Sequence, residues 1–92
     1  MLVKLVEVKR EMRGGTATLS EIYVNSTHII SVTEDVQASQ YLVTEAKRLG
    51  LHDDIKFSKV TIAEGSQSKS LTVVGSPPEV YGKIKQRQVL RG

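Results

Sequence analysis

The sequence predicts one α+β domain with an antiparallel sheet of about five strands, in the order β-β-β-α-β-β-α, and with the helices packed on one face. Aliphatic and β-branched runs come in pairs separated by short polar or glycine-containing turns, as in β-hairpins. Two segments carry helix signals, and each of them follows a group of strands instead of alternating singly with strands. Paired strands imply an antiparallel sheet, which could also curl toward a small barrel.

The first expected hairpin joins a strand at residues 2–8 to a strand at residues 17–24. Gly14-Gly15 between them favours a turn, because glycine reaches positive φ without steric cost. The apolar positions of the second strand change phase once, between Leu19 and Ile22. A β-bulge produces such a slip, so we expect one here.

Residues 21–34 hold the densest β-branched run and are interpreted as two strands joined by a polar turn. The turn falls at Asn25-Ser26-Thr27, where all three side chains can bond the local backbone. His28 opens the return strand. One wall of the aliphatic core is expected from Ile22, Val24, Ile30 and Val32.

A helix is predicted over residues 36–49. Glu34-Asp35 place negative charge just before it, where the helix dipole favours an anion. Gly50 follows the last apolar position, as in a Schellman cap, which requires a left-handed residue.

The second half of the chain predicts a hairpin and a capped helix. Strands at 55–63 and 69–74 flank a loop at 64–68. Ser76-Pro77-Pro78-Glu79 is a capping box with proline at the first helical position, and the helix is expected to end near residue 87. Residues 1–92 then form one small domain, with a loose tail at 88–92.

Composition excludes several classes of function. The 92 residues contain no cysteine, which rules out disulfides, thiolate metal sites and a cysteine nucleophile. The N-terminal apolar run carries Lys4 and Glu7, unlike a secretory signal, and no apolar run approaches the roughly 20 residues that span a bilayer. We therefore expect a cytoplasmic protein.

No arrangement of residues favours catalysis. The serines lack a Gly-x-Ser-x-Gly motif, the glycines form no phosphate-binding motif, and the carboxylates form no isolated pair in an apolar setting. His52-Asp53-Asp54 could offer metal ligands, but three adjacent side chains converge on one centre only in a special loop. The sequence predicts no enzyme, no catalytic residue, no cofactor and no metal site.

Basic residues suggest one possible binding surface. The formal net charge of +3 is mild, and the densest group lies near the C-terminus. Such a group is most simply a solvated helix face, and contact with nucleic-acid phosphates is the sharper alternative. The candidate contacts are Lys83, Lys85, Arg87, Arg91, Lys47 and Arg48.

Two segments carry a resemblance. Residues 21–32, Glu-Ile-Tyr-Val-Asn-Ser-Thr-His-Ile-Ile-Ser-Val, resemble the hairpin of small bacterial and phage accessory proteins of the FlbD type. Residues 60–65 and 71–84 are similar to that group's ending, a hairpin followed by a capped helix. The ending is also similar to that of the carbon-storage regulator, a dimeric RNA-binding protein whose basic signature is not evident here. The predicted helix at 36–49 is an insertion relative to the FlbD pattern.

The resemblance implies a small regulatory or accessory protein, phage-encoded or bacterial, and transfers no catalytic residue. Open sheet edges can pair with a protein partner or with another copy of the chain. The sequence therefore predicts a non-catalytic protein that acts through protein–protein contacts. The alternative is a nucleic-acid-binding regulator that uses the basic face of the C-terminal helix.

Overall fold

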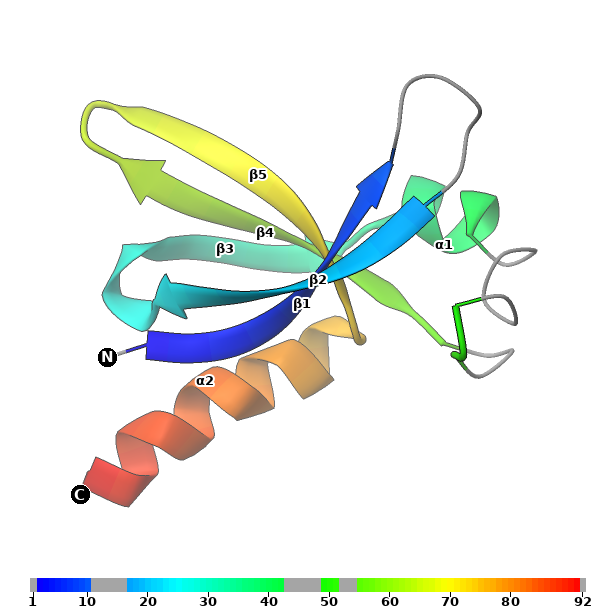
Figure 1. Cartoon of the computed structure of the whole chain (residues 1–92). Coiled ribbons are helices and arrows are strands. Elements are labelled where there is room, and N and C mark those ends of the chain that lie inside the picture. The colour runs from blue at the N-terminus through cyan, green and yellow to red at the C-terminus, as the bar shows by residue number, and fades with distance from the viewer. Residues whose placement is uncertain (1, 11–16, 43–48, 52–54, 92) are drawn as a thin grey trace.

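The computed structural model describes residues 2–10, 17–42, 49–51 and 55–91, and gives the backbone alone at residues 10, 41 and 86–91. It confirms the predicted fold class and the order of the elements (Figure 1). The strands are β1 (Leu2–Arg10), β2 (Ala17–Asn25), β3 (Ile29–Glu34), β4 (Phe57–Glu64) and β5 (Gln67–Val74). The helices are α1 (Val36–Tyr41) and α2 (Pro77–Arg91), and a short 3-10 turn, η1 (Ser26–His28), lies between β2 and β3.

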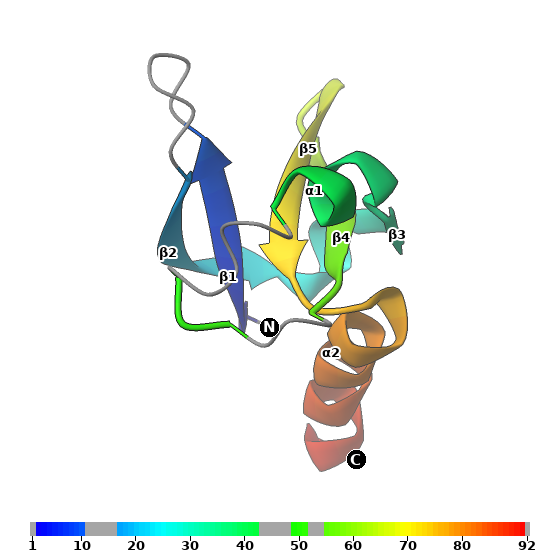
Figure 2. The ribbon, with the colours of Figure 1, turned by 90° about the vertical axis from the view of Figure 1, so that its right-hand side faces the viewer.

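The five strands form one antiparallel sheet in the order β2-β1-β5-β4-β3. The β1–β2 pair joins the other three strands through β5, where Glu7 lies opposite Val73. The two edge strands, β2 and β3, are consecutive in the chain and are connected through η1. Figures 1 and 2 show the β1–β2 pair set at an angle to the β3–β4–β5 group, so the sheet is strongly curled.

The prediction that the two strands within residues 21–34 pair as a hairpin is wrong. β2 pairs with β1 over its whole length, from Leu2↔Asn25 to Arg10↔Ala17, and β3 pairs with β4. The polar turn between them is present: Asn25 Oδ1 accepts hydrogen bonds from the backbone N–H (3.1 Å) and the hydroxyl (2.8 Å) of Thr27. This capped 3-10 turn redirects the chain to the other edge of the sheet instead of folding it back on β2.

The bulge expected in β2 is also wrong, because the β1–β2 register is unbroken. The change of phase has another cause. Leu19 packs against one hydrophobic cluster and Ile22 against a second, so the two halves of β2 bury opposite sides.

These two clusters separate the helices. The α2 cluster consists of Val3, Leu5, Val24, Val60, Ile62, Val73, Val80 and Ile84. The α1 cluster consists of Val8, Ala17, Leu42 and Phe57, with Ala38 of α1 packed against it. Side chains alternate along β4, so Phe57 and Val60 face opposite sides of the sheet. The helices therefore do not share one face as expected, and Figures 1 and 2 show them well apart.

A bulge does occur in β3, where the register with β4 shifts between Ile29 and Ser31. This shift changes which side chains of β3 face the core, compared with the alternation that the sequence predicted. Ile29 and Val32 pack against the α2 cluster, whereas Ile30 is 60% exposed and is not part of the core wall. The extra residue of a bulge disrupts the strict alternation on which the prediction relied.

The helices differ from their predicted lengths. α1 begins as predicted: Asp35 Oδ1 accepts a hydrogen bond from Ala38 N–H (3.0 Å). The described helix ends at Tyr41 instead of residue 49, residues 43–48 of the prediction lie outside the described residues, and Gly50 has the expected positive φ of 77°. α2 extends to Arg91, beyond the predicted end at residue 87, because no proline or glycine interrupts residues 83–91. No helix in the described part of the chain has the length and apolar character to span a bilayer.

Candidate protein-interaction groove

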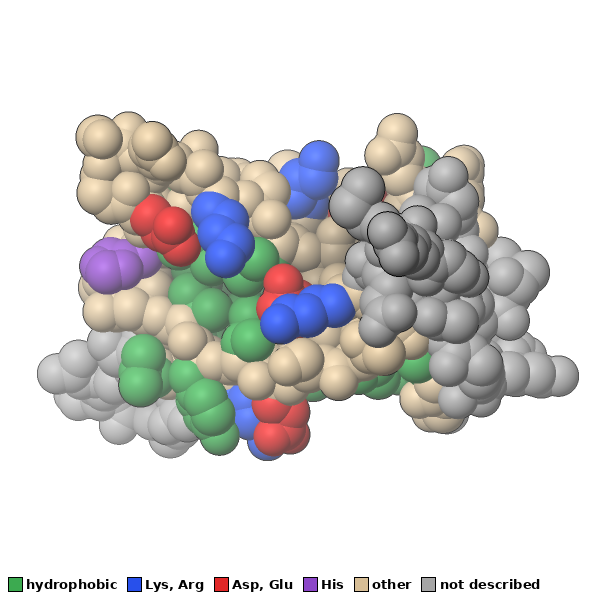
Figure 3. All heavy atoms as spheres, turned by 45° about the horizontal axis from the view of Figure 1, so that its top comes forward, with side chains coloured by type: hydrophobic (Ala, Val, Ile, Leu, Met, Phe, Trp, Pro, Cys, Tyr) green, Lys and Arg blue, Asp and Glu red, His purple; other side chains and the backbone are tan. Residues whose placement is uncertain are grey.

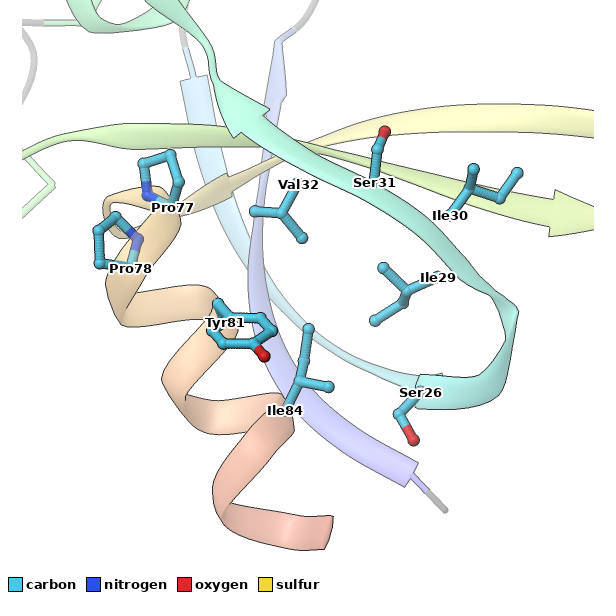
Figure 4. Close-up of a pocket in the computed structure, with 9 residues that line it drawn as sticks. All are labelled: Ser26, Ile29, Ile30, Ser31, Val32, Pro77, Pro78, Tyr81 and Ile84. Carbon is cyan, nitrogen blue, oxygen red and sulfur yellow. The ribbon is translucent and has the colours of Figure 1, made fainter.

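A hollow of about 550 Å³ lies between the edge strand β3 and the helix α2, and we call it the interaction groove. Figure 4 shows its lining residues, which come from η1, β3 and the first two turns of α2. None of them is charged. They are Ser26, Ile29, Ile30, Ser31, Val32, Pro77, Pro78, Tyr81 and Ile84.

The groove follows the free edge of β3. In the described structure β3 pairs with β4 and with no other strand. Four consecutive residues, 29–32, line the groove at the β3 bulge, where Ile29 and Val32 face the α2 cluster and Ile30 is exposed. Along its free edge a strand keeps backbone N–H and C=O groups that can pair with another chain.

The inner surface is apolar and partly open to water. In Figure 4, Ile29 and Val32 of β3 point toward Tyr81 and Ile84 of α2. Ile84 is buried in the α2 cluster, whereas Tyr81 is 57% exposed and Ile30 flanks the strand from the other face. An exposed tyrosine beside aliphatic side chains is typical of protein-binding surfaces.

The start of α2 is held rigidly by the predicted capping box. Glu79 Oε1 accepts hydrogen bonds from the backbone N–H (3.2 Å) and the hydroxyl (2.9 Å) of Ser76. These hydrogen bonds, helped by the nearby Lys83 ammonium, lower the pKa of Glu79 from its ordinary value. Pro77 then begins the helix with a φ that suits its first position. The wall formed by Pro77 and Pro78 is thus preorganised.

Gly75 sets the path from β5 into α2. Its φ of 118° is poorly accessible to other residues, and an added Cβ would lie 3.4 Å from Val80 Cγ2. The buried Ser58 hydroxyl donates a hydrogen bond of 2.7 Å to the Gly75 carbonyl, and Gly75 N–H donates one of 2.8 Å to the Lys56 carbonyl. This junction fixes where α2 leaves the sheet and therefore the width of the groove.

A second hollow of about 320 Å³ lies between β2 and the β4–β5 hairpin. Its lining mixes the aliphatic residues Ile22 and Leu71 with Glu7, His28 and Lys69, among others. Figure 3 shows a face on which hydrophobic side chains lie beside acidic, basic and histidine side chains. No buried polar side-chain atom of the described residues lacks a hydrogen-bond partner.

The structure describes the side chains of two of the six basic residues predicted to contact nucleic acid, Lys83 and Lys85, and does not bring these two together. Lys83 and Lys85 are both exposed on α2. Residues that are two apart in the sequence of an α-helix point in directions about 200° apart around the helix axis. They therefore lie on different sides of α2. The side chains of Arg87 and Arg91 lie outside what the structure describes, as do Lys47 and Arg48 altogether.

Metal-ligating groups do not gather in the described part of the chain, where no three His, Asp or Glu side chains are placed to hold an ion. The candidate His52-Asp53-Asp54 lies outside the described residues. His28 is exposed at the end of η1, just before the strand that it was expected to open.

Comparison of the chain with protein-family models, curated proteins and solved structures found no match. The resemblance to proteins of the FlbD type therefore stays a prediction.

The groove was not predicted, although part of its signal is present in the sequence. Pro78 and Tyr81 are three residues apart in a helix whose start is strongly marked, so they lie on one stripe. Their proximity to β3 depends on the sheet order, which places β3 at an edge beside α2.

Proposed function

We propose that this chain is a small regulatory or accessory protein without catalytic activity, and that it acts through protein contacts made by the interaction groove. The observation that most supports this proposal is an uncharged, largely apolar hollow that runs along an unpaired strand edge. An extended segment can add to such an edge by backbone hydrogen bonds while its side chains fill the adjoining hollow.

The described contacts suggest how a bound segment would gain affinity. Its backbone would pair with β3, and alternate side chains would pack against Ile29, Val32 and Tyr81. Tyr81 and Ile30 are large exposed side chains, and a bound segment would cover them. Burial of apolar surface stabilises a complex by roughly 25 cal/mol per Å². The rigid start of α2 lowers the cost of ordering this wall on binding.

The proposed function includes a bacterial or phage origin of the protein and a location in the cytoplasm. The resemblance of residues 21–32 to proteins of the FlbD type supports a bacterial or phage origin. The absence of cysteine supports a reducing compartment such as the cytoplasm. Nucleic-acid binding has less support, because Lys83 and Lys85 lie on different sides of α2.

A photo-crosslinking amino acid at position 81 tests the proposal. Tyr81 lies in the groove, and Tyr23, which is 63% exposed on the opposite edge strand, provides a matched control position. We expect protein adducts from position 81, few adducts from position 23, and loss of the position 81 adducts after Ile30→Ser. Mass spectrometry would identify the adducts.

The same proteins should be titrated against labelled RNA and duplex DNA at two salt concentrations. Absence of protein adducts at position 81, or equal yields at both positions, would contradict the proposal. Salt-dependent nucleic-acid binding that is weakened by Lys85→Gln would favour the alternative.

A further inference from the structure

We propose that the occupant of the interaction groove is a second copy of this chain, paired edge to edge through β3 about a two-fold axis. The inference rests on the proposed function, since it names the partner of the same groove. It comes from the charges at the two ends of the groove.

Glu34 lies at one end of the interaction groove. Glu34 is the last residue of β3 and lies opposite Ser58, while Val32 lies opposite Val60. Residues two apart in a strand share a face, so Glu34 continues the groove-lining side of Val32. Its side chain is exposed.

Lys85 marks the other end. Pro78, Tyr81 and Lys85 are spaced by three and four residues, which places them on one stripe of α2. The first two line the groove, and Lys85 is the next exposed position of that stripe. Among the described residues the ion pair recorded is Lys4–Glu21 (3.3 Å), and neither Glu34 nor Lys85 takes part in one.

The helix and the strand run in opposite directions along the groove. Figure 4 shows Pro77 and Pro78 at the end of the groove near Val32, and Ile84 at the end near Ser26 and Ile29. Figure 1 agrees, because α2 starts near the end of β3 and runs back toward η1. The groove is therefore uncharged along its length, with a carboxylate at one end and an ammonium group at the other.

Such a surface is complementary to itself when one copy is turned end for end. A two-fold axis across the middle of β3 pairs the two strands antiparallel and brings each Glu34 toward Lys85 of the other copy. Both charge contacts form at once, and the exposed Ile30 and Tyr81 of both copies lie in or beside the interface. Docking in the parallel sense would place like charges together, so the charge pattern selects one orientation.

Charge reversal and mixing test this arrangement. Glu34→Lys alone and Lys85→Glu alone each create two like-charge contacts in a two-fold dimer. An equimolar mixture of the two variants forms a heterodimer in which both contacts are again opposite in sign. Lys83→Glu, on the other side of α2, is the matched control.

Light scattering and sedimentation over a range of protein concentrations provide the measurement. We expect the wild-type chain and Lys83→Glu to form a dimer. Glu34→Lys alone and Lys85→Glu alone should each raise the dimer dissociation constant about ten-fold or more. Mixing these two variants should restore the dimer. Sedimentation shows whether the variants stay compact, and far-ultraviolet circular dichroism shows whether they stay folded.

Two results would overturn the inference: a wild-type monomer at all concentrations, or a mixture that stays as dissociated as its components. The crosslinking experiment separates this failure from failure of the proposed function. If the chain is monomeric but position 81 captures a different protein, the self-pairing is wrong and the groove remains a protein contact. If position 81 captures nothing, both are wrong.

Discussion

Glu79 acts on the helix that forms one wall of the groove, although it does not line the groove itself. Its carboxylate accepts two hydrogen bonds from Ser76, and Lys83 lies one turn further along α2. These contacts favour the ionised carboxyl in the folded chain, so they lower its pKa and couple helix capping to pH.

We expect Glu79→Gln to lower the free energy of unfolding near neutral pH by about 0.5 kcal/mol, a small value because the exposed site is screened by water. A lowered folded pKa means that the carboxylate stabilises the fold above its unfolded pKa, near 4.5, and that this stabilisation is lost as the pH falls through the lower folded value. The difference between wild type and variant should therefore shrink on acidification.

Urea unfolding at a series of pH values from neutral to acidic checks this expectation. Glu64→Gln, an exposed residue at the end of β4, is the control and should change stability little at neutral pH. A difference between wild type and Glu79→Gln that persists in strong acid would show that the carboxylate charge is not the cause.

At the scale of elements, the β4–β5 hairpin shows how a turn residue sets a register. The strands pair up to Glu64↔Gln67, so Gly65 and Ser66 form a two-residue turn instead of the expected longer loop. Gly65 has a φ of 60°, and no described residue other than glycine has a positive φ. Glycine at the first central position is the pattern of a type II′ turn, which matches the twist of the flanking strands.

Two glycine-to-alanine changes should have opposite effects on stability. Gly65→Ala forces alanine into a positive φ and should lower the free energy of unfolding by about 1–2 kcal/mol. Gly82→Ala, in α2, meets no atom within 4 Å and should raise it by about 0.5–1 kcal/mol. Chemical denaturation of both variants provides the comparison. If both changes destabilise the chain, Gly82 has a packing role that the open space around it does not indicate.

At the scale of the whole molecule, a hydrophobic cluster packs on each face of the sheet. The α2 cluster and the α1 cluster are separate, and Asp35 helps to join α1 to the sheet. Asp35 Oδ2 accepts a hydrogen bond of 2.8 Å from the Thr72 hydroxyl of β5, and its backbone N–H donates one of 2.9 Å to the Phe57 carbonyl. The smaller α1 cluster is therefore expected to contribute to global stability and not only to a local segment.

Phe57→Ala tests this expectation. Phe57 is fully buried at the centre of the α1 cluster, and its truncation should lower the free energy of unfolding by about 3–5 kcal/mol. Tyr23→Ala removes a comparable ring at an exposed position and should have an effect within about 0.5 kcal/mol. Thermal and urea unfolding followed by circular dichroism would measure both. A small effect of Phe57→Ala would mean that the α1 cluster unfolds independently.

Local chemistry explains what the sequence alone determined about this protein. Strand content, the order of the elements, the Asp35 start of α1, the Asn25 turn and the Ser76 capping box all follow from residues within a few positions of one another. Propensities, caps and turn preferences act over that range. The fold class could therefore be predicted, since it depends on these local signals in sequence.

Only the tertiary structure decided how the strands pair and where the hollow between β3 and α2 forms. The Asn25 turn is compatible with a hairpin, yet β2 pairs with β1 and β3 pairs with β4, because burial of both sheet faces depends on contacts far apart in sequence. The bulge that exposes Ile30 leaves no sign in the local pattern. The interaction groove exists because long-range pairing leaves β3 at an edge and the Gly75 junction sets α2 beside it.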